Sequence, residues 1–468
     1  MVISFDFDRS VPLTEQIEKR LRLSIEEGSL HPGSRLPSVR QLARQCGVSV
    51  PTVVEAYNRL VAMGRVEARR GSGYYVSRRG TDAPVFLRRM PADLPIDSMW
   101  LLRHVYEEVN FQIEAGSGWL PENWLYEEGL KGGLRSLARA PAAQLMRYGT
   151  PHGYLPLRQL IQTQLQARGI DARPHQIVLT HGASEALSLL VRLLTKEGDT
   201  VLIDDPGYCN LISLIKQQGV HAVGVPRTAT GPDVQSFSEL VALHRPRAFF
   251  TNTCLQNPTG TDYSAATAHQ VLQIADKAGL VIVEDDIFGD LHPVPMPTLA
   301  AMDRLRSVVH VQSFSKTISP ALRVGFLVCP EAMVDEVVHL KMLSSLTTSE
   351  IAERLVFAIL TEGHYRHHLE SLRDRLMRHQ AEACRGLEDA GMALFHKPSS
   401  GMFVWAGFRH EVSAGEVVSR AARQGIMLAP GSLFRVDGSD APWFRFNVAH
   451  CNNPLLFRLL EEITRETA

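Results

Sequence analysis

The sequence predicts an α/β protein in two unequal parts: a small winged helix-turn-helix domain at the N-terminus and a large domain with a mainly parallel sheet. Three helical patterns and two strand patterns fill the first 77 residues, whereas short apolar strands alternate with helices from about residue 145. Charge also divides the chain. Residues 1–80 carry 13 Lys/Arg against 8 Asp/Glu, although all 468 residues together have a net charge of −1. The N-terminal part is therefore basic and the remainder mildly acidic.

Local signals predict three helices in the N-terminal part. The first covers residues 13–27, where apolar residues recur every four positions. Ser38, with a Gln three residues later, forms a capping box at the start of a short second helix, which ends before Gly47. The third helix begins at Ser49 and continues to about residue 63. Two helices joined by a tight turn are typical of the helix-turn-helix, whose second helix lies in the major groove of DNA.

Two strand patterns, 65–69 and 74–77, flank a turn with two glycines, and we interpret this hairpin as a wing. The segments P-G-x-R-L-P-S-x-R, G-V-S and G-x-G across residues 13–76 resemble the GntR-type winged-helix domain. The resemblance implies four residues at the DNA: Arg40 in the second helix, Ser49 at the start of the third, Thr52 at a phosphate, and Gly73 in the wing.

The third helix departs from the GntR pattern in its first turn. An Arg often follows the Ser in that family, whereas this chain has Val50 and Pro51. Because base readout commonly uses Arg, Lys, Asn or Gln, the operator sequence stays open. A solvated three-helix module without a role at nucleic acid is the alternative interpretation.

A linker and an α/β domain are predicted for the rest of the chain. Residues 78–97 combine three prolines with four arginines and follow no period, so they separate a domain at 1–77 from one at 98–468. Helical stretches such as 184–196 and 265–278 then separate apolar strands at 177–180, 200–204, 221–225, 247–253, 280–286, 307–314 and 323–328. This alternation predicts a mainly parallel sheet covered on both faces, with ligands at the carboxyl ends of its strands.

Polar motifs lie at the ends of five of these strands. They are Gly182-Ala183-Ser184, Asp205-Pro206-Gly207-Tyr208, Asn257-Pro258-Thr259-Gly260, Asp285, and Ser313-Phe314-Ser315-Lys316 with Arg323 seven residues later. Free amides at the start of a helix bind anions, and an arginine fork grips a phosphate. A carboxylate that ends an apolar strand needs a cation or a donor, while a lysine amine can form a Schiff base.

Together these motifs resemble the fold-type I, class I aminotransferases over about residues 98–468. The resemblance implies the aspartate aminotransferase fold and pyridoxal 5′-phosphate (PLP) as cofactor. It implies a Schiff base on Lys316, a partner for the ring nitrogen in Asp285, a donor to the ring oxygen in Asn257, and a stacking ring in Tyr208. It further implies phosphate contacts by Ala183, Ser184, Ser313, Ser315 and Arg323, a contribution to the neighbouring subunit by Tyr148, and an α-carboxylate contact by Arg445 in the segment F-R-F-N.

Simpler roles stay open for several of these residues. Ser184 or Asp285 could cap a helix, and Arg445 could form a surface ion pair. Class I relatives usually have a tyrosine two or three residues after the ring-nitrogen Asp, whereas Ile287 and Phe288 stand here. The missing phenol argues against turnover.

A GntR-type domain followed by an aminotransferase-like domain resembles the MocR-type transcriptional regulators. The resemblance implies a homodimer on a double-stranded DNA operator, with PLP and an amino compound as effectors. Two alternatives stay open: a catalytically active transaminase that carries a DNA-binding domain, and a DNA-binding protein with an inactive C-terminal domain. The effector, the operator and the direction of regulation are left open by the sequence.

The remaining patterns bear on metals, disulfides and location. The six cysteines are scattered without a C-x-x-C pair, and the 18 histidines form no H-E-x-x-H motif, so we expect neither disulfides nor a metal site. We see no signal peptide, and no apolar run approaches the roughly 20 residues of a membrane span. We therefore expect a cytoplasmic protein with no membrane partner.

Overall fold

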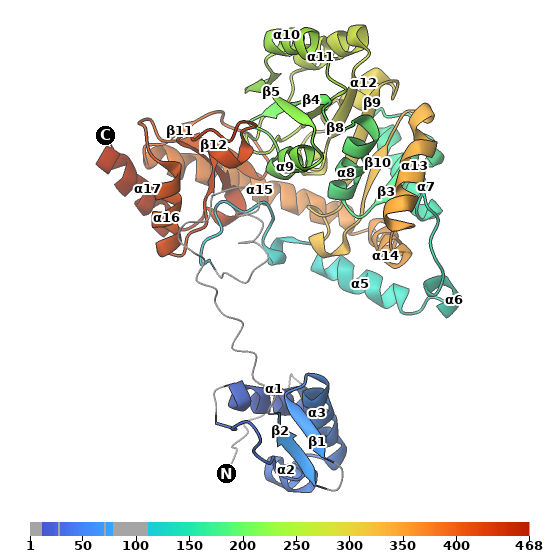
Figure 1. The fold of residues 1–468 in the computed structure, drawn as a ribbon, viewed down its shortest axis with the longest axis vertical. Coiled ribbons are helices and arrows are strands. Elements are labelled where there is room, and N and C mark those ends of the chain that lie inside the picture. Colours follow the sequence, from blue (N-terminus) through green and yellow to red (C-terminus); the bar gives the residue numbers. More distant parts are fainter. Residues whose placement is uncertain (1–11, 27–28, 70–71, 78–110, 468) are drawn as a thin grey trace. The chain divides into compact units, whose positions relative to one another are not determined.

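The computed structural model describes residues 12–26, 29–69, 72–77 and 111–467 (Figure 1). Contacts within the chain divide it into two compact units, Met1–Leu94 and Pro95–Ala468. The predicted linker, residues 78–97, and the first residues of the predicted second domain lie outside the described residues, so the predicted boundaries stay predictions. Within the described ranges, no helix is long and apolar enough to cross a membrane.

The described elements of the N-terminal unit are α1 (Leu13–Glu26), α2 (Val39–Cys46), α3 (Val50–Ala62), β1 (Val66–Arg69) and β2 (Gly73–Val76) (Figure 1). Local contacts set their ends. The Ser38 Oγ accepts a hydrogen bond from the amide of Gln41 at 3.3 Å, and Gly47 ends α2 with a φ of 65°, which glycine adopts without strain. β1 and β2 pair antiparallel. The winged helix-turn-helix is therefore present, with its ends within one residue of the predicted ones.

One apolar core holds the N-terminal unit together. The three helices contribute Ile17, Leu42 and Tyr57, which are fully buried, and the hairpin contributes Val66 and Val76. The core fixes the angle at which α3 is presented, because α3 packs against both α1 and α2. Burial of these side chains therefore positions the exposed side of α3.

A large sheet forms the centre of the C-terminal unit, in the order β3-β10-β9-β8-β7-β4-β5-β6. The strands are β3 (Ile177–Thr180), β4 (Thr200–Asp205), β5 (His221–Thr228), β6 (Gly231–Pro232), β7 (Ala248–Thr251), β8 (Val281–Asp285), β9 (Val308–Ser313) and β10 (Gly325–Val328). β4, β5, β7, β8 and β9 are parallel to their neighbours in this set, whereas β10 is antiparallel to both β3 and β9. The sheet is mainly parallel, as predicted.

The predicted start of the last strand, 323–328, is wrong by two residues. Arg323 ends a short 3-10 helix (η4, Pro320–Leu322) in a left-handed conformation with a φ of 50°, and the strand begins only at Gly325. The reversed direction of β10 was also not predicted, since the sequence pattern does not distinguish the two directions. Arg323 is thereby placed in a turn at the edge of the sheet instead of within a strand.

Helices cover both faces of the large sheet. They are α7 (Leu155–Ala167), α8 (Ala183–Leu194), α9 (Cys209–Gln217), α10 (Val234–His244), α11 (Ala265–Ala278), α12 (Leu299–Asp303), α13 (Val334–Ser345) and α14 (Glu350–Thr361). α5 (Glu127–Leu137) packs against α14, and the short α6 (Ala142–Leu145) follows it. Neighbouring residues of one strand belong to opposite cores: Val201 packs with α8, α9 and α13, while Leu202 packs with α7, α10 and α11. Two buried layers therefore hold the strand ends in place.

A smaller sheet, in the order β11-β12-β14-β13, completes the C-terminal unit. Its strands are β11 (Ala393–Leu394), β12 (Phe403–Gly407), β13 (Ala429–Pro430) and β14 (Trp443–Asn447), and its helices are α15 (Tyr365–Asp389), α16 (Ala414–Arg423) and α17 (Pro454–Thr467). Figure 1 shows α15 as the long helix that continues from beside the large sheet to the smaller one. This antiparallel layer was not among the predicted elements.

Candidate functional site

A pocket of about 610 Å³ lies at the carboxyl ends of the central strands. Ten predicted site residues line it: Ala183, Ser184, Tyr208, Asn257, Asp285, Ser313, Ser315, Lys316, Arg323 and Arg445. Tyr148 does not line it, and the side chain of Tyr148 is 85% exposed. The fold therefore gathers residues from seven segments of the chain, as expected where parallel strands end at one edge of a sheet.

Lys316 follows β9 and extends its amine into this pocket. The Nζ donates a hydrogen bond to the backbone oxygen of Gly118 at 2.6 Å. Burial, together with the nearby guanidinium groups of Arg445 and Arg323, lowers the pKa of Lys316 to about 8. A substantial fraction of the amine is therefore neutral slightly above neutral pH, which is the form that attacks a carbonyl.

Asp285 ends β8 as a buried carboxylate. Its Oδ1 accepts a hydrogen bond from the amide of Ile287 at 3.3 Å, and Asn252 Nδ2 donates to its backbone oxygen at 2.6 Å. Burial is the main cause that raises the pKa of Asp285 to about 7, and no described residue forms an ion pair with it. A cationic N–H donor placed in the pocket would restore the charged form. Asp285 therefore has the chemistry that a protonated pyridine nitrogen requires.

A further group of pocket residues supplies hydrogen-bond donors for an anion. α8 begins at Ala183, so the amides of its first turn are free, and Arg323 Nη2 donates to His181 O at 3.0 Å. Gly182 has a φ of 78°, which favours glycine, and a Cβ there would lie 2.7 Å from Arg323 Nη2, so a larger residue would displace the guanidinium. The hydroxyls of Ser313 and Ser315 bond to each other at 2.9 Å, and Ser313 Oγ also donates to Val324 O at 3.3 Å, so a hydroxyl that rotates toward an anion adds a donor. This set fits a phosphate group.

Arg445 is a buried cation without an anionic partner. It lies in β14, is 2% exposed, and its guanidinium carbon stands 4.8 Å from the ring centres of both Phe403 and Phe434. Nη1 donates to Asn257 Oδ1 at 3.0 Å and Nη2 to Gly116 O at 2.7 Å, while Nε has no hydrogen-bond partner among the residues that the structure describes. Burial lowers the pKa of Arg445 to about 10. In the described part of the chain no carboxylate balances this charge, so the alternative of a surface ion pair is wrong.

Asn257 is oriented by Arg445. Because its Oδ1 accepts from the guanidinium, its Nδ2 is left to donate into the pocket. Tyr208 lies nearby with its hydroxyl accepting from Asn210 Nδ2 at 3.1 Å. An amide donor and an aromatic ring are thus placed where a planar heterocycle would need them.

Sequence reasoning missed the segment that closes the pocket over Lys316. Gly118 and Trp119 line the pocket, and Gly116 accepts from Arg445. A Cβ on Gly116 would lie 2.3 Å from the amide nitrogen of Ala429, so this close approach requires glycine. The two glycines of the sequence G-S-G-W, residues 116–119, were the feature that could have indicated a close approach of the backbone here.

Phe288 stands where class I relatives usually have a tyrosine, so the side chain here has no hydroxyl. It is 2% exposed, lines the pocket, and packs edge-on against Phe403 at 5.5 Å. Ile287 also lines the pocket. Tyr208 carries the single phenol among the described pocket residues.

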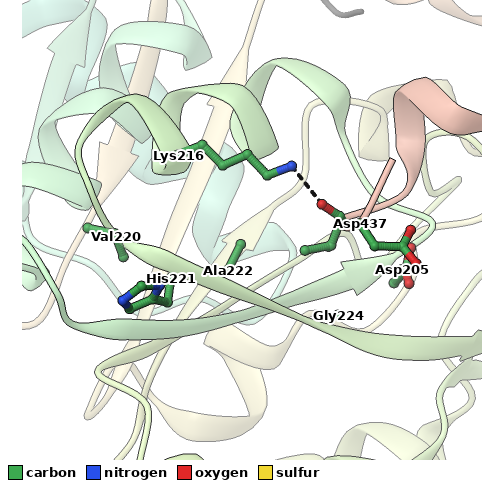
Figure 2. Close-up of a pocket in the computed structure, with 8 residues that line it drawn as sticks. Asp205, Lys216, Val220, His221, Ala222, Gly224 and Asp437 are labelled. Carbon is green, nitrogen blue, oxygen red and sulfur yellow. Dashed lines mark hydrogen bonds between the residues drawn. The ribbon is translucent and has the colours of Figure 1, made fainter. Parts of the chain in front are cut away.

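A second hollow, lined by residues including Asp205 and His221, lies beside β5 (Figure 2). Lys216 Nζ donates there to the backbone oxygen of Val436 at 2.6 Å, which ties α9 to the segment after a 3-10 helix, η6 (Gly431–Phe434). None of the predicted site residues lines this hollow. The two hollows are therefore chemically distinct, and the predicted chemistry belongs to the first.

The predicted DNA contacts lie on the N-terminal unit. Arg40 is exposed on α2, and Gly73 is exposed at the start of β2 with a φ of 110°. Ser49 caps α3: its Oγ accepts from the amide of Thr52 at 3.3 Å and lies 2.7 Å from the Thr52 Oγ1. Two residues of the wing turn, 70 and 71, lie outside the described residues.

A family model described as "Aminotransferase class I and II" matches residues 128–463. The chain belongs to the class I and II aminotransferase family. In this aminotransferase-family protein, a second model, "Bacterial regulatory proteins, gntR family", matches residues 13–76. The predicted fusion of a GntR-type DNA-binding domain with an aminotransferase-like domain is confirmed.

Relatives of this aminotransferase-family protein include full-length regulators. The chain is 28% identical over 442 residues to the uncharacterised HTH-type transcriptional regulator YdfD of Bacillus subtilis, covering 91% of this chain and 90% of that protein. It is 27% identical over 454 residues to the probable rhizopine catabolism regulatory protein MocR of Rhizobium meliloti, covering 92% and 88%. The predicted resemblance to MocR-type regulators is confirmed.

A solved structure supports the cofactor. The α-aminoadipate aminotransferase LysN of Thermus thermophilus, complexed with N-(5′-phosphopyridoxyl)-L-leucine, is 26% identical and superposes with a TM-score of 0.71 over 78% of this chain and 95% of that chain. Family membership and this neighbour support the predicted PLP, and the donor set of the pocket fits its ring and phosphate.

Proposed function

We propose that this protein is a PLP-dependent transcriptional regulator whose aminotransferase-like domain binds an amino compound and alters DNA binding by the GntR-type domain. One observation carries the proposal. The pocket holds a buried carboxylate, Asp285, and a buried guanidinium, Arg445, and within the described residues neither has an ionic partner. Such charges are costly unless a ligand of opposite charge meets them. A zwitterionic amino compound and a pyridine ring supply those charges.

The residues of the pocket divide into those for PLP and those for the effector. Bound PLP supplies an electrophilic carbonyl carbon and a ring that accepts electrons. The first turn of α8, the two serines and Arg323 bind its phosphate, Asp285 accepts from its ring nitrogen, Asn257 donates to its ring oxygen, and Tyr208 covers its ring. Lys316 provides the amine that holds it. Arg445 then binds the carboxylate of the amino compound through two parallel hydrogen bonds.

Phe288 favours sensing over turnover. A phenol at this position would donate to the ring oxygen and tune proton transfer, whereas the phenyl ring packs against Phe403 and donates nothing. A catalytically active transaminase is the second candidate, because Lys316, Asp285 and Arg445 line one pocket and the LysN neighbour is an aminotransferase. The two candidates differ in one product: an oxo-acid appears only if turnover occurs.

We further propose a homodimer in the cytoplasm. Six large apolar residues are exposed on two segments: Met146 and Tyr148 on one, and Met342, Leu343, Leu346 and Ile351 on the other. The segments adjoin, since the buried Lys341 donates to Pro151 O at 2.6 Å and to Thr348 Oγ1 at 3.2 Å. A second copy would cover these residues and receive Tyr148 in its pocket.

The test uses the full-length protein with PLP bound. The visible absorbance band is recorded while each L-amino acid is added with an oxo-acid acceptor, and retention of selected genomic DNA fragments is measured in parallel. A change in the band together with changed DNA retention and no oxo-acid product is expected. Steady formation of product would support the transaminase instead. Unchanged DNA retention across all amino compounds that alter the band would contradict the proposed coupling.

A further inference from the structure

The solvent-facing side of α3 is apolar in its first turn. Val50 is 45% exposed and Pro51 is exposed, while Val54, one turn later, is half-buried. The opposite side of the helix packs into the core through Val53, Ala56, Tyr57 and Leu60. This packing fixes the rotation of α3 about its axis. Val50 is therefore held at the surface by the fold and is not exposed by a local irregularity.

Polar groups near Val50 are engaged or lie on other turns. The hydroxyls of Ser49 and Thr52 bond to each other at 2.7 Å, with Ser49 capping the helix. Glu55 forms an ion pair with Arg59 at 3.2 Å, one turn further along. Two exposed positive charges precede α3, at Arg40 and Arg44, and both belong to α2. The arginines of α2 can therefore contact phosphates, while Val50 and Pro51 in the first turn of α3 present only methyl and methylene groups.

The major groove presents one apolar group on its base edges. This is the C5-methyl group of thymine, which small apolar side chains contact. The recognition helix of a helix-turn-helix enters this groove with its N-terminal residues at the bases. The exposed valine and proline of this turn therefore match thymine, and their side chains offer no donor to the O6 and N7 acceptors of guanine, which arginine reads.

We propose that Val50 reads the C5-methyl group of a thymine in each half-site of the operator. The inference rests on the proposed function, because it assumes that α3 enters the major groove of DNA. Burial of one methyl group corresponds to about 0.8 kcal/mol, or about a fourfold change in the dissociation constant. A two-fold symmetric protein makes the contact twice, so both together change affinity about 15-fold.

The test removes single methyl groups from the DNA. An operator is first selected from random duplexes with the full-length protein, and each thymine is then replaced by deoxyuridine, which lacks only the C5-methyl group. We expect one position in each half-site to lose affinity about fourfold. Replacing that thymine by 5-methylcytosine, with guanine opposite, should bind about fourfold better than unmethylated cytosine at the same place.

Protein variants assign the methyl contact to Val50. Val50→Ala should bind the thymine and deoxyuridine operators with nearly equal affinity. Met63→Ala is the matched control, because Met63 is 51% exposed at the other end of the same helix and should keep the fourfold difference. Thermal unfolding and salt-dependent binding to non-specific DNA check that both variants fold.

Three results would overturn the proposal, and they are distinguishable. If no single deoxyuridine changes affinity, no methyl group is read. If Val50→Ala keeps the difference, and Val54→Ala removes it, the reading residue is Val54. If the full-length protein retards no duplex at low salt, DNA binding itself is absent and the proposed function fails with this inference.

Discussion

Substituting Arg445 by lysine should weaken binding of the amino compound far more than binding of PLP. The guanidinium now donates from two nitrogens, Nη1 to Asn257 Oδ1 and Nη2 to Gly116 O, and sits between two phenyl rings. A lysine ammonium is a point charge that cannot reproduce the planar fork. Loss of one hydrogen bond to a charged carboxylate corresponds to about 1.5–3 kcal/mol, so affinity for the amino compound should fall about 10- to 150-fold.

The assay measures two affinities on the full-length protein. PLP is titrated into the apoprotein by its visible band, and the proteinogenic L-amino acid that binds most tightly is then titrated by calorimetry. Arg323→Lys serves as the matched control, because Arg323 lies at the phosphate side of the pocket and should reverse the pattern. Thermal unfolding detects any general loss of structure, since lysine leaves a buried oxygen without its donor.

Equal losses of PLP and amino-acid affinity in Arg445→Lys would refute the reasoning. Arg445 would then support the pocket as a whole through Asn257 and Gly116, and the carboxylate would bind elsewhere.

Three further predictions follow from the same contacts. The rate at which the apoprotein captures PLP should rise with pH around a midpoint near 8, because Lys316 is protonated and unreactive below its lowered pKa. The variant Lys316→Ala should remain folded but give no borohydride-reducible adduct with PLP. Phe288→Tyr should shift the pH-dependent change of the visible band to lower pH, since a phenol beside the ring oxygen stabilises the deprotonated form; an unmoved titration would mean that another donor already acts. Arg40→Ala should weaken operator binding by about 1–3 kcal/mol if it contacts a base edge, and wild-type binding should fall steeply with salt; a gel-shift series that is insensitive to salt would contradict a basic, phosphate-contacting domain.

The sequence by itself determined the elements whose ends depend on local contacts. Ser38 caps the start of α2, Gly47 caps its end, and Ser49 caps the start of α3, through hydrogen bonds that span a few residues. The strand ends with their polar motifs were predictable for a similar reason, because a short apolar run followed by glycine or a carboxylate marks where a buried strand meets solvent. Ten residues named from those motifs and the family resemblance line one pocket.

Only the tertiary structure decided which distant segments meet. Gly118 O accepts from Lys316 across 198 positions of sequence, and Gly116 O accepts from Arg445 across 329. The reversed β10 between β3 and β9, and the small sheet that carries Arg445, likewise depend on pairing between remote strands. No local pattern encodes such pairs, since they form only when both cores pack against one set of strands. Packing in the C-terminal unit buries Asp285 and Arg445 without an ionic partner among the described residues, and packing in the N-terminal unit turns Val50 outward on a helix whose other side is core.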